Sequence, residues 1–313
     1  MAFDKVFYNQ ASEEKLGWKP EWFGVKYNDE NLINVVKVWQ RKIGIKADGL
    51  VGPMTFRRIW TERDASISKH QPNQSSSTYS LGRFCRTNNY IVHNGNFLPI
   101  DWHKVVLWDE PNGLRIEPGR YYDYAGQKDR VPQMFVNHWD VCLSSETCAK
   151  ILNKRGISVH FCIDNDGTIY QILDMQHGAW HASNWAGNKR GIGVEISNAY
   201  YTKYQDWYDE NGFGERPIVE SSTVHGINLK NYLDFYPIQI KALKALWKSV
   251  HLAFNIPLVC PTNSNGTPCK TIYDGCTKGS FSGFVNHYNF TKGKIDCANL
   301  DMISLLQEVK ESL

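Results

Sequence analysis

The chain has 313 residues, of which 42% are hydrophobic and 21% are charged. This length and composition are typical of a globular protein with two domains, or with one large domain and an accessory module. The formal net charge of +3 is too small to indicate a nucleic-acid partner, so we expect none. Aromatic residues make up 13% of the chain, a content that suits either a Trp-rich core or the binding of sugars and extended ligands.

The sequence carries no signal for export or membrane insertion. The N-terminal segment MAFDKVFYNQASEEKLGW lacks the apolar region of a secretory signal. No window of about 18 apolar residues occurs, so we expect no membrane insertion. We therefore expect synthesis in a cytoplasm, where the cysteines are mostly free thiols. Cys260, Cys269 and Cys276 could instead form a structural metal site or a late disulfide, although their spacing matches no standard zinc pattern.

In chain order, the first predicted elements form a small helical unit. Apolar residues at helical spacing predict an amphipathic helix over residues 31–42. Asp48-Gly49 is typical of a tight turn, and Pro53 predicts the start of a second helix. The segment 64–83 is rich in Ser, Gln and Asn and is predicted to be a linker.

These patterns divide the chain into a helical module at residues 1–63, the linker, and a second domain at residues 84–313. Strands and helices alternate in the second domain, which is typical of an α/β fold. The predicted strands cover residues 90–93, 104–108, 134–138, 158–163, 168–172 and 191–196. The predicted helices cover residues 144–154, 238–254 and 301–313.

The helical module contains a recognisable pattern, in which Trp39-Gln40-Arg41 is followed by D-G-L-V-G-P-M-T at residues 48–55. This pattern resembles the peptidoglycan-binding repeat of many cell-wall hydrolases, which is a small three-helix module. The resemblance implies a wall-anchoring module that raises the concentration of the enzyme at its substrate. The alternative is a structural subdomain whose glycines only make turns.

Several side chains in the second domain could bind a metal. A hydrolytic zinc needs three protein ligands and an open position for water. His138 follows an apolar strand, and His287 precedes a basic turn that is followed by Asp296 and Cys297. Taken singly, each histidine is more typical of a surface or hydrogen-bonded core residue than of a ligand.

The order of short motifs along the second domain is more specific than any single residue. The motifs are F-V-N-H at 135–138, S-V-H-F at 158–161, D-G-T-I-Y at 166–170, A-W-H-A at 179–182, G-I-G-V-E at 191–195, and H…K-I-D at 287–296. This set resembles the N-acetylmuramoyl-L-alanine amidase family of phage endolysins, wall-recycling amidases and peptidoglycan recognition proteins. The resemblance covers residues 131–310, with insertions at 199–236 and 256–283, and implies a mixed central sheet flanked by helices.

The resemblance also implies a set of zinc ligands. His138 matches the first ligand and His287 the second, and the third is an Asp or Cys two positions after a catalytic Lys. Lys294 matches that Lys, which makes Asp296 the third ligand, because residues i and i+2 of an extended segment lie on one side. Cys297 also falls within the variable gap of the family, and a thiolate binds zinc tightly, so it stays an alternative.

Glu195 lies in the apolar strand of the G-I-G-V-E motif, where a carboxylate is costly to bury without a partner or a function. The resemblance makes it the acid/base carboxylate beside the metal, whereas the alternative is an ion pair with a Lys or Arg. Some endolysins use a Tyr just before the His-Phe of the second strand instead. Val159 occupies that position here, which favours Glu195.

The implied activity is hydrolysis of the amide bond between N-acetylmuramic acid and L-alanine in bacterial peptidoglycan. Zinc lowers the pKa of water, Glu195 carries the proton to the leaving amine, and Lys294 stabilises the oxyanion together with zinc. Trp180 and His181 match a segment that lines the substrate groove, and His160 is expected to be structural. The two-module organisation indicates a phage endolysin that is made in the host cytoplasm and acts on the wall after release.

Three other interpretations are weighed against this one. A zinc peptidase that cuts the stem peptide would carry an H-x-x-E-H or H-x-H signature, which the sequence lacks. A zinc-free recognition protein would have lost a ligand, whereas all three ligand positions are filled here. A structural phage component with lytic activity cannot be separated from a free endolysin by sequence.

Overall fold

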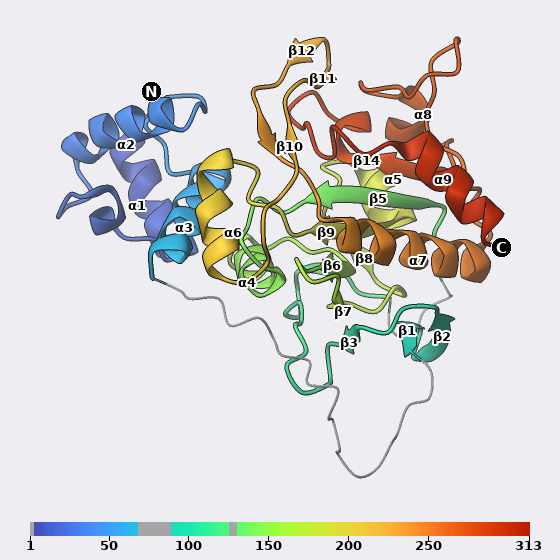
Figure 1. Cartoon of the computed structure of the whole chain (residues 1–313). Helices are drawn as coiled ribbons and strands as arrows, with labels where there is room; N and C mark the ends of the chain where they lie inside the picture. Colours follow the sequence, from blue (N-terminus) through green and yellow to red (C-terminus); the bar gives the residue numbers. More distant parts are fainter. Residues whose placement is uncertain (1–2, 68–88, 125–129) are drawn as a thin grey trace. The chain divides into compact units, whose positions relative to one another are not determined.

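Figure 1 shows the computed structural model of the chain, which describes residues 3–67, 89–124 and 130–313. The described residues form two compact units, one that ends at residue 67 and one that begins at residue 89. The first four residues of the predicted linker belong to a helix, and the others lie outside the described residues.

The N-terminal unit is helical. The helices predicted over residues 31–42 and from Pro53 are both confirmed. The first helix was not predicted from the residues. Asp4 caps this helix by accepting a hydrogen bond from the backbone of Phe7. The elements are α1 (Lys5–Leu16), η1 (Pro20–Phe23), α2 (Glu30–Lys42) and α3 (Pro53–Ile67).

The pattern that resembles a peptidoglycan-binding repeat organises the interior of this unit. Gln40 is 1% exposed, and its amide oxygen accepts a hydrogen bond from the backbone of Gly49 at 2.8 Å. Its amide nitrogen lies within 3.1 Å of the Asp48 carboxylate and the Thr55 hydroxyl. Gly49 has a φ of +79°, and a Cβ there would lie 2.6 Å from the Ile33 side chain. These residues of the pattern therefore support the local fold.

The second unit is built on a six-stranded sheet with the strand order β14-β5-β9-β6-β7-β3. All neighbouring pairs are parallel except β6 and β7, so the sheet is mixed, as predicted. The strands are β3 (Val105–Leu107), β5 (Met134–Trp139), β6 (Phe161–Ile163), β7 (Ile169–Gln171), β9 (Gly191–Ile196) and β14 (Gly283–Asn286).

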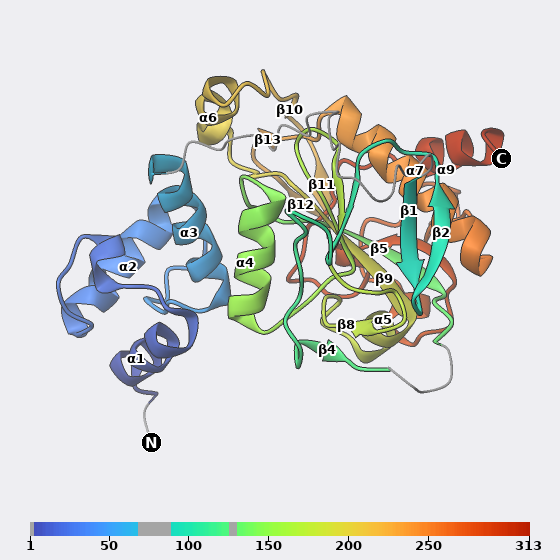
Figure 2. The ribbon, with the colours of Figure 1, turned by 90° about the horizontal axis from the view of Figure 1, so that it is seen from below.

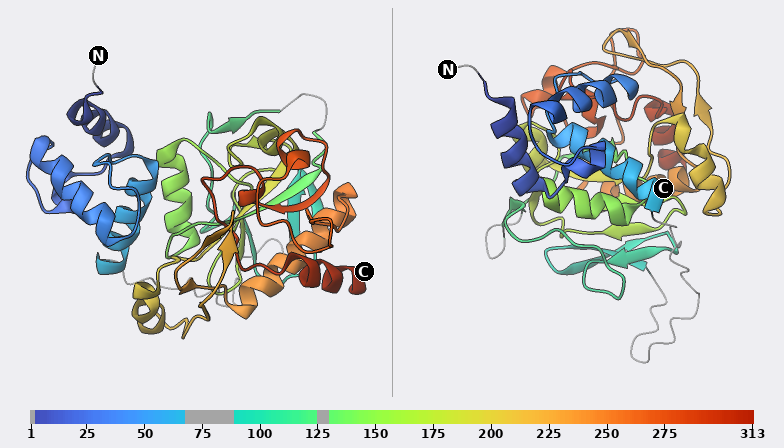
Figure 3. Two further views of the ribbon diagram at one scale, coloured as in Figure 1. Left: turned by 90° about the horizontal axis from the view of Figure 1, so that it is seen from above. Right: turned by 90° about the vertical axis from the view of Figure 1, so that its left-hand side faces the viewer.

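Helices cover both faces of this sheet, and Figures 2 and 3 show α4 and α7 on opposite sides of it. The predicted helices over residues 144–154, 238–254 and 301–313 are confirmed with small changes at their ends. The helices of this unit are α4 (Ser145–Arg155), α5 (Trp185–Arg190), α6 (Gln205–Glu210), α7 (Pro237–Phe254), α8 (Asp274–Thr277) and α9 (Met302–Glu311). No helix in the described ranges is both long and apolar enough to span a membrane.

Side chains of β5 alternate between the two faces, although the whole strand is buried. Phe135 packs edge-on against Trp247 of α7, and Asn137 accepts a hydrogen bond from the same indole. Val136 packs on the other face, in a cluster with Ala182. His138 therefore emerges on the face opposite α7, at the carboxyl end of the strand.

Two strands of the central sheet differ from the prediction. The strand predicted over 158–163 begins only at Phe161, because Ser158 donates its backbone N–H to Trp180 in a loop. Strand β14 was not predicted, since four residues are too few for a clear periodic pattern. The remaining short elements are β1 (Asn89–His93), β2 (Asn96–Ile100), β4 (Tyr121–Tyr122), β8 (Gly178–Ala179), η2 (Thr202–Tyr204), β10 (Ile218–Val219), β11 (Thr223–Val224), β12 (Ile227–Asn228), β13 (Tyr232–Leu233) and η3 (His287–Asn289).

The insertion at residues 199–236 packs around a buried arginine. The guanidinium of Arg216 lies 4.3 Å from the ring centres of both Tyr208 and Tyr236. It also donates hydrogen bonds to the backbone oxygens of Ser197 and Asp234, at 2.9 and 2.7 Å. Because Ser197 directly follows β9, Arg216 joins this insertion to the central sheet.

Candidate metal centre

Two histidines meet because of the register of two parallel strands. Asn286, the last residue of β14, is paired with Asn137 of β5. The next residue of each chain segment is a histidine, and the carboxyl ends of parallel strands lie at the same edge of a sheet. His138 and His287 are therefore brought together although 149 positions separate them in the sequence.

The chain segment after η3 brings the third candidate ligand, Asp296, close to the two histidines. The Nδ1 atoms of His138 and His287 lie 2.8 Å apart. The Oδ2 atom of Asp296 lies 3.3 Å from the first of these nitrogens and 3.0 Å from the second. All three residues are buried, with exposed fractions of 1%, 3% and 6%. The three atoms form one of the groups in the described residues that could hold a metal ion.

These distances fit a tetrahedral zinc ion. A zinc about 2.0–2.1 Å from each ligand atom would separate the ligand atoms by roughly 3.3 Å, close to the three distances observed. The ligand set of two imidazoles and one carboxylate also matches zinc chemistry. A cation would accept the facing lone pairs of both imidazoles, which otherwise need a proton between them.

The buried environment prepares these groups for a metal. Burial lowers the pKa of His287 to about 3, so its ring is neutral at neutral pH. Burial alone would raise the pKa of Asp296, but His287, His138 and Lys294 hold it well below its usual range. A neutral imidazole and an ionised carboxylate are the protonation states in which these groups bind metal.

Cys297, the alternative third ligand, lies in a different environment. Its side chain is fully buried in the hydrophobic core cluster, and burial raises the pKa of its thiol well above the ordinary range. The candidate metal group contains Asp296 and does not contain Cys297. The geometry therefore favours Asp296.

Glu195 and Lys294 both lie near the candidate ligands. Glu195 of β9 is the register partner of His138 on β5, so the two side chains emerge on the same face of the sheet. Glu195 is 7% exposed. The Lys294 ammonium is close enough to lower the pKa values of both His287 and Asp296. The structure thus brings the three candidate ligands together, places Glu195 on the same face of the sheet as His138, and places Lys294 within electrostatic range of two of the ligands. The chemical roles of these residues stay predictions.

His181 and Trp180, the two predicted substrate contacts, differ in their surroundings. The Nδ1 atom of His181 lies 2.9 Å from Nε2 of His138, and burial lowers the pKa of His181 well below its usual value. Trp180 is half-buried, and its ring packs edge-on against Tyr122. The contact between His181 and His138 was not predicted from the sequence, where the A-W-H-A motif around His181 is its only local signal.

His160 has the surroundings of a structural residue. Its Nδ1 accepts a hydrogen bond from the backbone of Gly193 at 3.0 Å, and its Nε2 lies 3.0 Å from the carbonyl oxygen of His177. Both ring nitrogens are therefore occupied by backbone groups. Its pKa is lowered well below the usual value, first by burial and then by the neighbouring Arg130.

A second buried group in the described residues combines Asp140, Cys142 and Cys148. One carboxylate oxygen of Asp140 accepts hydrogen bonds from the backbones of Cys142 and Asn198, and the other accepts one from Ser197. This carboxylate therefore joins the segments that follow β5 and β9. The cysteines at 260, 269 and 276 are free thiols, and they are not among the possible metal groups of the described residues.

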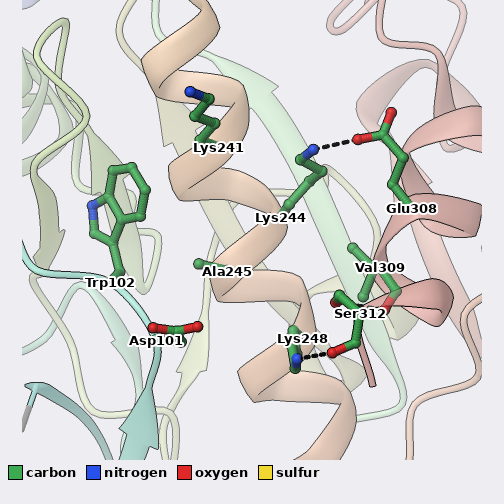
Figure 4. Close-up of a pocket in the computed structure, with 9 residues that line it drawn as sticks. All are labelled: Asp101, Trp102, Lys241, Lys244, Ala245, Lys248, Glu308, Val309 and Ser312. Carbon is green, nitrogen blue, oxygen red and sulfur yellow. Dashed lines mark hydrogen bonds and ion pairs between the residues drawn. The ribbon is translucent and has the colours of Figure 1, made fainter.

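Figure 4 shows a pocket between α7 and α9 that is separate from these residues. Lys241, Lys244 and Lys248 line it from α7, and Lys244 forms an ion pair with Glu308 of α9. Asp101 and Trp102, from the segment after β2, also line it. None of the candidate metal or acid/base residues lines this pocket.

The mixed sheet carries a buried His-His-Asp group that could hold a hydrolytic metal ion. A family match over part of the chain identifies the protein as an enzyme of the amidase class. Residues 128–263 match the N-acetylmuramoyl-L-alanine amidase family, and the chain carries a domain of this family. The matched range contains His138 and Glu195 and ends before His287 and Asp296, so those two assignments depend on the geometry.

Several solved structures are similar to part of the chain. A mutant endolysin from Bacillus subtilis is 17% identical, and the match covers 66% of this chain and 97% of that one with a TM-score of 0.35. The N-acetylmuramoyl-L-alanine amidase LysC from Clostridium intestinale is 15% identical, with 67% and 99% covered and a TM-score of 0.37. AmpDh3 from Pseudomonas aeruginosa, solved in complex with anhydromuramic pentapeptide, is 19% identical, with 63% and 66% covered and a TM-score of 0.36. No curated protein sequence matches the chain.

Proposed function

We propose that the protein is a zinc-dependent N-acetylmuramoyl-L-alanine amidase that cuts the bond between N-acetylmuramic acid and L-alanine in bacterial peptidoglycan. The observation that carries this proposal is the group formed by His138, His287 and Asp296, whose ligand atoms lie 2.8–3.3 Å apart. The match of residues 128–263 to the amidase family supports it independently.

The proposed mechanism assigns a task to each residue. Zinc, when bound by these three residues, supplies a Lewis acid and lowers the pKa of water to about 7. Glu195 accepts the proton of the attacking water and later delivers it to the nitrogen of the leaving L-alanine. Lys294 stabilises the negative charge that develops on the lactyl carbonyl oxygen, an effect worth about 2.7–4 kcal/mol for one donor. The register pairing of Glu195 with His138 supports a role close to the ligands.

We further propose that the enzyme is a phage-type endolysin that is made in the host cytoplasm and reaches the wall after release. The helical N-terminal unit would serve as the wall-anchoring module that its sequence pattern indicates. The hydrogen bonds of Gln40 with Asp48 and Thr55 hold three residues of this pattern together in the unit. Trp180 is proposed to contact the substrate.

Mass spectrometry of digested peptidoglycan tests the reaction. The amidase should release stem peptides with free L-alanine N-termini and create no new reducing sugar ends. New reducing ends would instead indicate a glycosidase, and cleavage inside the stem peptide would indicate a peptidase. Metal analysis of the purified protein should give about one zinc per chain. A protein that holds no zinc and shows no activity after zinc is added would contradict the proposal.

A further inference from the structure

His181 touches the side of His138 that faces away from the candidate metal atoms. The Nδ1 atom of His138 faces His287, whereas its Nε2 atom lies 2.9 Å from Nδ1 of His181. The two rings are nearly perpendicular, with their centres 5.1 Å apart and an angle of 84° between the planes. This is the geometry of a hydrogen bond between the edges of two imidazoles.

The ring of His181 is held in this position from two sides. The backbone N–H groups of His181 and Ala182 both donate to Oδ1 of Asn188, at 2.9 and 2.7 Å. The ring lies directly over Gly193 of β9, where a Cβ would come within 2.8 Å of Nδ1. The absence of a side chain at residue 193 thus leaves the space that the ring occupies.

The direction of this hydrogen bond follows from the metal geometry. A histidine that binds a metal through Nδ1 carries its proton on Nε2, so Nε2 of His138 is the donor. Nδ1 of His181 must then accept, and the proton of His181 must be on its own Nε2. That Nε2 atom is buried and has no hydrogen-bond partner within the described part of the chain, so no other contact opposes this tautomer.

We propose that His181 is a positioning residue, which accepts a hydrogen bond from His138 and so sets the ring orientation and tautomer of this zinc ligand. This inference rests on the proposed zinc-dependent function. The sequence predicts that His181 contacts the substrate, whereas the role proposed for it here acts through the zinc ligand His138. Loss of such an outer partner typically weakens metal affinity by about 10–100-fold.

Two substitutions separate the hydrogen bond from the packing of the ring. His181→Phe keeps a ring over Gly193 but removes the acceptor, and we expect its zinc dissociation constant to rise by about 10–100-fold. His181→Asn can place an amide oxygen where Nδ1 lies, so it should restore most of the affinity. His103→Phe, which removes an exposed histidine, is the matched control and should leave the affinity unchanged.

The measurement is competition for zinc against a chelator, which requires no substrate and no turnover. An unchanged dissociation constant in folded His181→Phe protein, beside tight zinc binding by the unsubstituted chain, would overturn this inference alone. An unsubstituted chain that binds no zinc would overturn the proposed function and this inference with it. Thermal unfolding of the zinc-free proteins shows whether each variant is folded.

A measurement on the unsubstituted protein keeps the inference testable if His181→Phe does not fold. Long-range ¹H–¹⁵N spectra of the zinc-loaded protein report the tautomer of each histidine ring. We expect His181 to carry its proton on Nε2 and His138 to carry its proton on Nε2 as well. A proton on Nδ1 of His181 would overturn the inference, because that nitrogen could then not accept.

Discussion

Adjacent residues Asp296 and Cys297 illustrate how the structure separates two candidates that the sequence leaves together. Both fall within the variable gap after His287, and both side chains can bind zinc. The Asp296 carboxylate faces the two imidazoles, whereas Cys297 packs into the hydrophobic core. A difference of one position in an irregular segment reverses the direction of a side chain, which no local pattern encodes.

The role of Glu195 can be tested by removing its charge while keeping its shape. We expect Glu195→Gln to retain zinc and to lower kcat by about 10²–10⁴-fold, because proton transfer by a positioned carboxylate typically contributes that much. Turnover is measured by the release of L-alanine N-termini, and zinc by metal analysis. Full activity in the variant would remove Glu195 from the mechanism.

The pKa of His287 predicts how the zinc-free protein responds to acid. Its pKa of about 3 in the folded protein lies below the ordinary value of 6.5, so the folded state resists protonation. The stabilisation from this group is complete above pH 6.5 and is lost as the pH falls toward 3. Asp296, whose pKa is also depressed, acts in the same direction below its usual range. The Tm of chelator-treated protein should therefore fall between pH 7 and pH 4.

His287→Gln provides the control for this effect. The variant lacks the imidazole, so its Tm should depend less on pH than that of the unsubstituted protein over the same range. Both proteins are compared without metal by calorimetry. An identical pH dependence of the two Tm values would contradict the assignment of the acid sensitivity to His287.

At the scale of elements, strand register builds the candidate site. The pairing of Asn286 with Asn137 aligns the ends of β14 and β5, and the pairing of His138 with Glu195 aligns β5 with β9. A shift of one residue in either pairing would turn the histidine or the carboxylate toward the opposite face. The site therefore depends on three strands, of which β14 has only four residues.

Gln40 plays a comparable organising role for the elements of the N-terminal unit. We expect Gln40→Ala to lower the free energy of unfolding of this unit by about 1–3 kcal/mol, because it leaves buried partners without a hydrogen bond. Calorimetry of the whole chain should show an earlier transition for this unit. Gln10→Ala removes an exposed side chain from the same unit and should have little effect.

At the scale of the whole molecule, the division into two units predicts a division of tasks. A chain that lacks residues 1–69 should still cleave soluble muramoyl peptides, because all the candidate catalytic residues lie in the second unit. Its activity on intact, insoluble peptidoglycan should fall on the order of 10²-fold if the N-terminal unit anchors the enzyme to the wall.

Parallel rate measurements on the two substrates distinguish anchoring from folding. Equal losses on both substrates would indicate that the second unit is damaged by the truncation. No loss on either substrate would contradict the proposed anchoring role of the first unit. Binding of the full chain to insoluble peptidoglycan, followed by sedimentation, provides an independent readout.

The sequence by itself determined the helices α2, α3, α4, α7 and α9, the strands β1, β3, β5, β7 and β9, and the order of the amidase motifs, because periodicity, turns and motif spacing are local properties. It also identified His138, His287, Asp296, Glu195 and Lys294 as candidates. Only the tertiary structure decided that His138, His287 and Asp296 meet. It also decided that Cys297 lies in the core and that His181 contacts a candidate ligand. The physical reason is that strand register and the loop after η3 bring together side chains that lie far apart in the sequence, such as His138 and Asp296. The sequence carries no local signal for such contacts.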